Sequence, residues 1–364
     1  MHVLVIGAGV SGLTTALALR RAGHRVTVVA EKFGSQLVSV VAGALWEWPP
    51  AVCGYHQDPI SLNRSKQWCL ASYREFRQLA ADAATGVFLR QANFYFKAPL
   101  EEQPRDFLKM QELRDNVDGF VRGAAMIRQH GICSAIGVQD AYGYLAPMID
   151  TDAYMAWLRQ QVEQAGCSVQ QRKISEPLDG CADRLRSEFS ADLLVNCTGL
   201  GAIDLCGDEM FPLRGALVRV KNRQKIQPPV ETAHCLSYSG EGDRQDMVFI
   251  VPRGQNMLLL GGLVEPDVWD TAIGLDNYQP IRDMFQRCQQ FLPALKEVEI
   301  DPQEPVRVGL RPFRAGGIRL EGENSTRTIH NYGHGGSGFT LSWGCAAEVV
   351  AIAGRMLGEI ESGG

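Results

Sequence analysis

The sequence has no hydrophobic run long enough to cross a membrane and no strong excess of one charge. No stretch approaches the ~18–20 consecutive apolar residues that a transmembrane helix needs. The 36 lysines and arginines are nearly balanced by 41 aspartates and glutamates, which leaves a net charge of −5. Nucleic-acid binding requires a basic surplus that can neutralise phosphates. We therefore expect neither a membrane nor a nucleic acid among the partners of this chain.

Paired cysteine motifs and metal-ligand spacings are also missing. The ten cysteines are scattered without a Cys-x-x-Cys pair, so buried free thiols in a reducing compartment are the simpler interpretation. His330 and His334 are four residues apart, but the glycines between them argue against a shared helix face, and no metal site is expected. Neither a signal peptide nor a peroxisomal tripeptide is recognisable. These observations predict a cytoplasmic location.

The beginning of the chain has the pattern of a dinucleotide-binding unit. Apolar runs at residues 3–6 and 26–30 flank Gly7-x-Gly9-x-x-Gly12 and a helical segment. In this motif Gly7 permits a tight turn, Gly9 lets a pyrophosphate approach, and Gly12 lets the helix pack on the strand. Glu31 follows the second strand, where a carboxylate can accept hydrogen bonds from a ribose. The motif, its two strands and its acidic residue together predict a Rossmann-like fold.

A second glycine-rich turn, near the end of the chain, favours FAD among the dinucleotides. Four glycines fall within residues 333–338 and lead directly into an apolar helical segment. Glycine lets backbone N–H groups approach a ligand, and a helix that begins there directs its positive dipole end at an electron-rich group. A flavin ring needs such a cradle far from the adenosine. The apolar segment 192–197, which ends in Thr198-Gly199, is placed to bring more backbone against the same cofactor.

The order of these elements predicts an α/β fold with two domains, for which 364 residues suffice. The FAD-binding domain is Rossmann-like and discontinuous, comprising residues 1–48, 146–204 and 306–364. The substrate-binding domain comprises residues 49–145 and 205–305. It is built on an antiparallel β-sheet, because segments 213–220, 233–239, 247–252 and 257–264 are strand-like and separated by turn residues.

Several motifs resemble those of the D-amino acid oxidase family, in order and along nearly the whole chain. His330-Asn331-Tyr332-Gly333-His334-Gly335-Gly336-x-Gly338 and the following Trp343-Gly344-Cys345-Ala346 are similar to the signature of D-amino acid and D-aspartate oxidases. Ala42-Gly43-Ala44-Leu45-Trp46 resembles the second flavin loop of the family, and Gly309-Leu310-Arg311-Pro312 its substrate-arginine motif. The resemblance implies noncovalently bound FAD and an active site between the flavin and an antiparallel sheet.

The resemblance also implies roles for individual residues. Arg311 would bind the substrate carboxylate, because a guanidinium forms a bidentate, charge-assisted pair with it, and the Gly336 carbonyl would receive the substrate amine. The FAD contacts fall on Gly7, Ala8, Gly9, Val10, Ser11 and Gly12 at the pyrophosphate; Glu31 and Lys32 at the ribose; Ser39, Gly43, Ala44 and Leu45 on the flavin side; Ile174, Thr198 and Gly199 in the middle; and Gly335, Gly336, Ser337, Gly338, Phe339 and Thr340 around the isoalloxazine ring.

The family usually supplies a tyrosine hydroxyl to the substrate carboxylate, but this chain has Phe249 at that position. Losing one such hydrogen bond to a charged group is worth about 1.5–3 kcal/mol if nothing replaces it. Tyr142, Tyr144 or Tyr238 could replace the hydroxyl, or could simply pack in the core. Phe249 therefore leaves the form of the substrate carboxylate open.

Two further residues of the predicted substrate pocket carry alternative interpretations. Glu47 stands where mammalian relatives have a neutral side chain. It either favours a cationic or amide-bearing substrate or is an acid that hydrogen-bonds to backbone. Trp48 either forms a wall of the pocket or fills the core.

The predicted reaction is FAD-dependent oxidation of the α-amine of an amino acid, with D-configuration implied by the resemblance alone. Hydride passes to flavin N5 without a protein base, the imine hydrolyses to a keto acid and ammonia, and oxygen reoxidises the flavin to give hydrogen peroxide. The protein supplies orientation and the cofactor the redox chemistry.

Three alternatives stay open. One is the same chemistry on glycine, an N-substituted amino acid, or an amino-acid ester or amide, which Phe249 keeps open. Another is a dehydrogenase that does not use oxygen, and the third is a binding protein without amine oxidation. The oligomeric state is also open, with a homodimer as one candidate.

Overall fold

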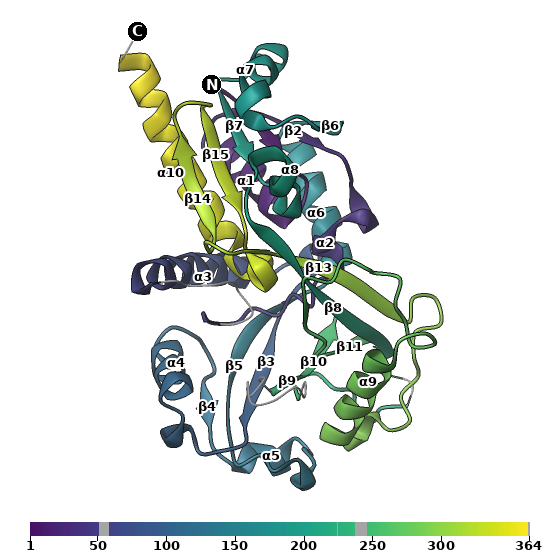
Figure 1. Ribbon diagram of the computed structural model, residues 1–364. Helices are drawn as coiled ribbons and strands as arrows, with labels where there is room; N and C mark the ends of the chain where they lie inside the picture. Colours follow the sequence, from purple (N-terminus) through teal and green to yellow (C-terminus); the bar gives the residue numbers. More distant parts are fainter. Residues whose placement is uncertain (51–57, 224, 237–245, 363–364) are drawn as a thin grey trace.

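The computed structural model describes residues 1–50, 58–223, 225–236 and 246–362. Two β-sheets organise these residues. A six-stranded sheet with its helices occupies the upper half of the view in Figure 1, and a nine-stranded sheet occupies the lower half. The strands β8 and β13 lie where the two halves meet.

The six-stranded sheet is parallel except at one edge. Its order is β14-β15-β7-β1-β2-β6, and only the β14–β15 pair is antiparallel. The strands are β1 (His2–Ile6), β2 (Arg25–Ala30), β6 (Ser168–Gln171), β7 (Leu193–Asn196), β14 (Arg319–Glu323) and β15 (Thr328–Tyr332). All five residues of β1 are buried, which explains its continuous apolar run, since helices cover both faces of such a sheet.

Among the described residues, seven helices lie on this sheet or pack against other helices beside it. They are α1 (Val10–Arg21), the short α2 (Val38–Val41), α3 (Pro59–Leu79), α6 (Thr151–Gln164), α7 (Leu178–Phe189), α8 (Ala202–Cys206) and α10 (Gly338–Ser362). The helix α1 packs on β1 and β2, α10 packs beside it on β14 and β15, and α10 also packs on α3. At the α10–α3 crossing a Cβ on Gly344 would lie 2.2 Å from the Cα of Trp68, so only glycine allows this approach.

The nine-stranded sheet runs in the order β12-β8-β11-β10-β9-β3-β5-β4, with β13 also paired to β8. Its strands are β3 (Val87–Phe96), β4 (Val121–Arg122), β5 (Asp140–Ile149), β8 (Met210–Lys221), β9 (Ala233–Leu236), β10 (Val248–Arg253), β11 (Met257–Gly261), β12 (Glu265–Pro266) and β13 (Val306–Arg314). The pairing is antiparallel as predicted, with one difference: β3 and β9 are parallel.

Alternation along these strands gives the sheet two different faces. The helix α9 (Gln279–Phe291) covers one face, where Ile281, Met284 and Phe291 join a core with Val218 and Ile250. The neighbouring residues Leu217 and Phe249 point to the opposite face. The helices α4 (Pro104–Arg114) and α5 (Ala125–Gln129) lie near the far edge of the sheet.

The predicted domain boundaries do not coincide with the ends of strands. Residue 146, predicted to begin the second FAD-binding segment, falls inside β5, and β13, predicted to belong to the FAD-binding domain, pairs along its whole length with β8. The boundaries therefore stay a proposal. The pairing establishes that β13 belongs to the nine-stranded sheet.

Candidate active site

A cavity of about 810 Å³ opens between the two sheets. The turns that follow β1 and β7, the loop after α2 and the glycine-rich turn before α10 contribute to its wall. The nine-stranded sheet contributes the face opposite α9, including Leu217 and Phe249. Segments from the beginning, middle and end of the chain therefore meet at one site.

The turn between β1 and α1 is shaped to receive an anion. Gly7 has φ +111°, and a Cβ there would lie 2.5 Å from the carbonyl oxygen of Cys197. A Cβ on Gly12 would lie 2.0 Å from the carbonyl oxygen of Gly7, so Gly12 lets the helix sit against the turn without lining the cavity. The first turn of α1 carries no acidic residue. The Val10 N–H already donates to the Ser39 hydroxyl, and the remaining positive end of the helix favours a phosphate.

At the end of β2 the cavity wall carries both signs of charge. Glu31 and Lys32 line it, and Lys173, next to Ile174, forms an ion pair with Glu31 at 3.5 Å. These side chains are largely exposed, so the ion pair itself adds little stability. The arrangement leaves the Glu31 carboxylate at the cavity, where it can accept hydrogen bonds from ribose hydroxyls.

The glycine-rich turn before α10 lies against β13. Gly335 has φ +54°, and a Cβ there would lie 2.8 Å from the ring of Phe313. Beside it, His334 is 4% exposed, and burial lowers its pKa to about 4, so the imidazole is neutral. His334 lines the cavity, and its Nε2 has no hydrogen-bond partner among the described residues.

A buried polar atom without a partner is costly, and a polar ligand in the cavity would satisfy Nε2 of His334. The two glycine turns, this atom and the anion site at α1 together fit a dinucleotide that carries a flavin. When bound, FAD would supply the acceptor for a hydride.

Buried arginines from the nine-stranded sheet hold the loop after α2 in place. Arg253 donates to the carbonyl of Ala42 at 2.6 Å and to that of Gly43 at 3.3 Å, and burial lowers the pKa of Arg253 to about 10. Arg307 donates to the carbonyl of Val40 at 3.1 Å. The sequence alone does not indicate that these arginines belong to the site. The only signal was an arginine directly after the apolar strand that ends at Pro252, and nothing local names its partners.

Arg311 extends from β13 over the backbone of Gly215, where a Cβ would lie 2.4 Å from its Nη1. Although part of its surface is open to the cavity, the surrounding protein removes enough water to lower its pKa to about 10. Its hydrogen bonds are two long contacts of 3.5 Å to the carbonyls of Leu213 and Arg214. Within the described ranges no carboxylate pairs with it. A guanidinium that is shielded from water and has no anionic partner loses its hydration without gaining an ion pair. Arg311 is therefore suited to bind an anionic ligand.

Most predicted site residues line the cavity, whereas Gly12, Trp48 and Tyr144 do not. Those on its wall are Gly7, Ala8, Gly9, Val10, Ser11, Glu31, Lys32, Ser39, Gly43, Ala44, Leu45, Glu47, Ile174, Thr198, Gly199, Phe249, Arg311, Gly335, Gly336, Ser337, Gly338, Phe339 and Thr340. Gly12 packs behind the wall. Trp48 is buried and donates from Nε1 to Glu112 at 3.2 Å. Tyr144 is buried and stacks on Phe94 with ring centroids 5.4 Å apart. Tyr238 lies outside the described residues.

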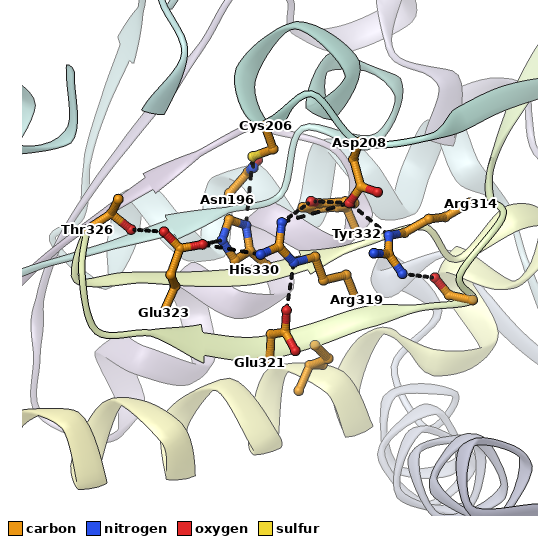
Figure 2. Close-up of polar contacts among 12 residues, drawn as sticks. Asn196, Cys206, Asp208, Arg314, Arg319, Glu321, Glu323, Thr326, His330 and Tyr332 are labelled. Carbon is orange, nitrogen blue, oxygen red and sulfur yellow. Dashed lines mark hydrogen bonds and ion pairs between the residues drawn. The ribbon is translucent and has the colours of Figure 1, made fainter. Parts of the chain in front are cut away.

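Behind the wall, Tyr332 connects the cavity to the polar network in Figure 2. Its hydroxyl donates to Asp208 at 2.7 Å and accepts from Arg319 at 2.9 Å, while Arg314 donates to the same carboxylate oxygen of Asp208 at 2.7 Å. His330 lies in this network rather than on the cavity wall, with Nε2 3.2 Å from Glu323. The network ties β14 and β15 to the segment after α8.

Replacing Asp208 by asparagine should destabilise the protein at neutral pH, by about 1.5–3 kcal/mol for hydrogen bonds to a charged group. Burial alone would raise the pKa of Asp208, but the hydrogen bonds from Arg314 and Tyr332 outweigh it and the net shift is downward. The ionised carboxylate therefore stabilises the fold above its unfolded pKa of about 3.9, and this contribution is lost as the pH falls through the lower folded value.

Thermal melts of the wild type and Asp208→Asn between pH 7 and pH 3 would measure this effect. The difference in melting temperature between the two proteins should become smaller as the pH falls. Glu321→Gln is the matched control, because Glu321 bonds to Arg319 in the same network but is largely exposed. An equal difference in melting temperature at pH 7 and at pH 3 would contradict the role assigned to the charge of Asp208.

The described residues include no helix that is long and apolar enough to cross a membrane. They also include no group of three or more histidine, cysteine, aspartate or glutamate side chains arranged to hold a metal ion.

The fold and the cavity define an FAD-dependent oxidoreductase, and the comparisons agree. A family model described as FAD dependent oxidoreductase (DAO) matches residues 2–352. A D-amino-acid oxidase of Rubrobacter xylanophilus is 33% identical over 98% of this chain and 97% of its own length, and one of Streptomyces coelicolor is 32% identical over 97% and 96%. This chain belongs to the D-amino acid oxidase family.

Solved structures support the fold. A glycine oxidase from Geobacillus kaustophilus superposes with a TM-score of 0.75 at 17% identity, covering 97% of this chain and 94% of that one. One from Bacillus cereus gives 0.73 at 18%, covering 98% and 95%. The predictions of the family, the fold class, FAD and an amino-acid oxidoreductase are thereby confirmed.

Proposed function

We propose that this enzyme oxidises the α-amine of a D-amino acid with a free carboxylate, using molecular oxygen to regenerate the oxidised flavin. The observation that carries the proposal is Arg311, a largely desolvated guanidinium without a carboxylate partner in the described part of the chain. It lies in the cavity that also holds the glycine-rich turn before α10. That combination fits a ligand with an anionic end held beside a flavin.

The chain's residues act in this proposal mainly by binding and orienting the substrate. Arg311 would hold the carboxylate through two parallel hydrogen bonds, and the Gly336 carbonyl would accept a hydrogen bond from the amine. Two fixed points on either side of the α-carbon define the direction of its hydrogen, and such positioning supplies much of the rate enhancement. D-configuration depends on which face of the α-carbon these contacts present.

The remainder of the wall near Arg311 would exclude water. Leu217, Phe249 and Leu310 line the cavity there with apolar surface. Low local polarity strengthens the charge-assisted pair with the carboxylate. No acid or base on the wall is assigned to proton abstraction, because the amine would bind in its neutral form and hydride leaves without one.

A second candidate is the same oxidation on glycine, an N-substituted amino acid or an amino-acid ester or amide. Phe249 favours it, because the position that supplies a hydroxyl to the carboxylate in relatives has none here. A dehydrogenase that does not use oxygen is a further candidate. The cytoplasmic location and the domain boundaries expected from the sequence are also part of the proposal, with a homodimer as one candidate for the oligomeric state.

A turnover panel tests the proposal against these candidates. Free D-amino acids, glycine, N-methyl amino acids and D-amino-acid methyl esters would be supplied to the aerobic holoenzyme, with hydrogen peroxide, ammonia and keto acid measured together. We expect equal amounts of the three products from free D-amino acids. Turnover of the esters or N-methyl compounds alone would reject the free-carboxylate substrate, and turnover only with an artificial acceptor would reject oxygen.

A further inference from the structure

The floor of the cavity carries an apolar strip that crosses the nine-stranded sheet. Leu217 on β8 faces Gly261 on β11, Gly261 pairs with Phe249 on β10, Phe249 with Cys235 on β9, and Cys235 with Phe94 on β3. All but Gly261 line the cavity. Gly261 has no side chain to interrupt the strip, since a Cβ there would lie 2.6 Å from Leu217.

Charged groups stand at opposite ends of this strip. At the β8 end, the Arg311 guanidinium lies over Gly215, two residues from Leu217. At the other end, Glu47 and Lys109 line the cavity and their charges act on Cys235 and Tyr142. The strands β8 and β9 are three spacings apart, which corresponds to about 14 Å.

The charged side chains at the end of the strip opposite Arg311 carry a net negative charge. Lys109 donates to Oε1 of Glu47 at 2.6 Å, and the side chains of Lys109 and Glu47 are 10% and 25% exposed. Asp106, one helical turn before Lys109 on α4, also lines the cavity and makes no ion pair within the described ranges. Two carboxylates against one ammonium leave one negative charge, and Oε2 of Glu47 has no partner among the described residues.

We propose that Glu47 and Asp106 form the side-chain subsite and select D-amino acids whose long side chain ends in a cation, of the lysine or arginine type. This inference rests on the proposed function. With its carboxylate on Arg311, the methylene stem of such a substrate lies along Leu217, Phe249 and Cys235. A lysine-length molecule with a hydrogen bond of about 2.8 Å at each end covers a distance comparable to the strip.

The ion pair has a definite part in this subsite. The hydrogen bond from Lys109 to Oε1 holds the Glu47 carboxylate in one orientation, which leaves Oε2 for the ligand. An acidic side chain would meet Glu47 and Asp106 before it reached the shielded ammonium. This proposal keeps the first sequence interpretation of Glu47, a preference for a cationic substrate, and adds a partner within the protein, a side chain 62 residues along the chain.

The test compares D-lysine with D-norleucine, which has the same stem without the ammonium. Wild-type holoenzyme should show kcat/KM at least about tenfold higher for D-lysine. Glu47→Gln should reduce this ratio by about tenfold or more, the range expected for one charge-assisted hydrogen bond, and Asp106→Asn should reduce it less. Glu112→Gln is the matched control: Glu112 is on the same α4 and binds Lys66 at 2.6 Å, but it does not line the cavity, so the ratio should not change.

A binding measurement separates this inference from the proposed function. Perturbation of the flavin absorbance by 6-aminohexanoate and by hexanoate needs no turnover. Tighter binding of 6-aminohexanoate that depends on Glu47 would support the subsite even if no D-amino acid were oxidised. Lysine-to-norleucine ratios that are unchanged in both Glu47→Gln and Asp106→Asn would overturn the subsite, leaving the ion pair as a structural contact. A wild-type preference for D-glutamate would overturn it as well.

Discussion

Replacing Arg311 by methionine is expected to lower kcat/KM for D-amino acids by between about 30-fold and 5,000-fold. Removing one partner of a buried, hydrogen-bonded charge pair costs about 2–5 kcal/mol, and each 1.4 kcal/mol is a factor of ten. The interaction that is lost is the one with the substrate carboxylate, because Arg311 forms no ion pair with a protein carboxylate within the described ranges. Steady-state kinetics with D-norleucine at a range of concentrations would measure it.

Arg311→Lys is the informative companion variant. It keeps the charge but loses the planar fork, so its kcat/KM should fall between the wild type and Arg311→Met. The FAD content of both variants should match the wild type, because Arg311 makes no contact that holds the turns at α1 or α10. Unchanged kcat/KM in Arg311→Met with full FAD content would contradict the assignment of the carboxylate site.

Replacing Gly7 by alanine is expected to weaken FAD binding by about 30-fold or more. The backbone at φ +111° strains any residue with a Cβ, by about 1–3 kcal/mol, and overpacking against the carbonyl of Cys197 adds about 1–3 kcal/mol. Relief of both requires a shift of this turn, which lines the cavity where the pyrophosphate would lie. Fluorescence titration of the apoprotein with FAD gives the dissociation constant.

Gly23→Ala is the control for backbone strain alone. Gly23 has φ +92°, but nothing lies within 4 Å of a Cβ placed there, and it is remote from the cavity wall. This variant should lose some thermal stability and keep its FAD affinity. If Gly7→Ala bound FAD as tightly as Gly23→Ala, the turn after β1 would not be the pyrophosphate site.

The cofactor side of the site could be predicted because its signals are local. A strand followed directly by Gly7-x-Gly9-x-x-Gly12 constrains its own backbone, and the same holds for the glycines before α10. In the structure both turns lie at the positions in the chain that the sequence predicts. Ser39 illustrates the limit: its hydroxyl accepts from the Val10 N–H at 2.9 Å, a contact across 29 residues that no motif encodes.

The substrate side could be predicted only in part, because it depends on the register and partners of distant strands. For Tyr144 and Trp48 the sequence leaves two alternatives, the pocket or the core, and the structure buries both. Tyr144 lies on β5, beyond the strand that carries Phe94, and the ring of Trp46 packs edge-on against it at 5.9 Å. The indole of Trp48 instead points to Glu112 on α4. Arg253 and Lys109, which the sequence did not indicate, act through contacts to residues more than 60 positions away.

The central step of the proposed reaction is reduction of the bound flavin by a D-amino acid that is anchored by its carboxylate on Arg311. Anaerobic mixing of the holoenzyme with D-lysine, D-norleucine and their L-enantiomers, followed by the visible flavin absorbance, tests it most directly. We expect both D-enantiomers to bleach the flavin and the L-enantiomers not to, and we expect Arg311→Met to be bleached far more slowly at the same concentrations. Bleaching by the L-enantiomers, or equally fast bleaching of Arg311→Met, would contradict this proposal.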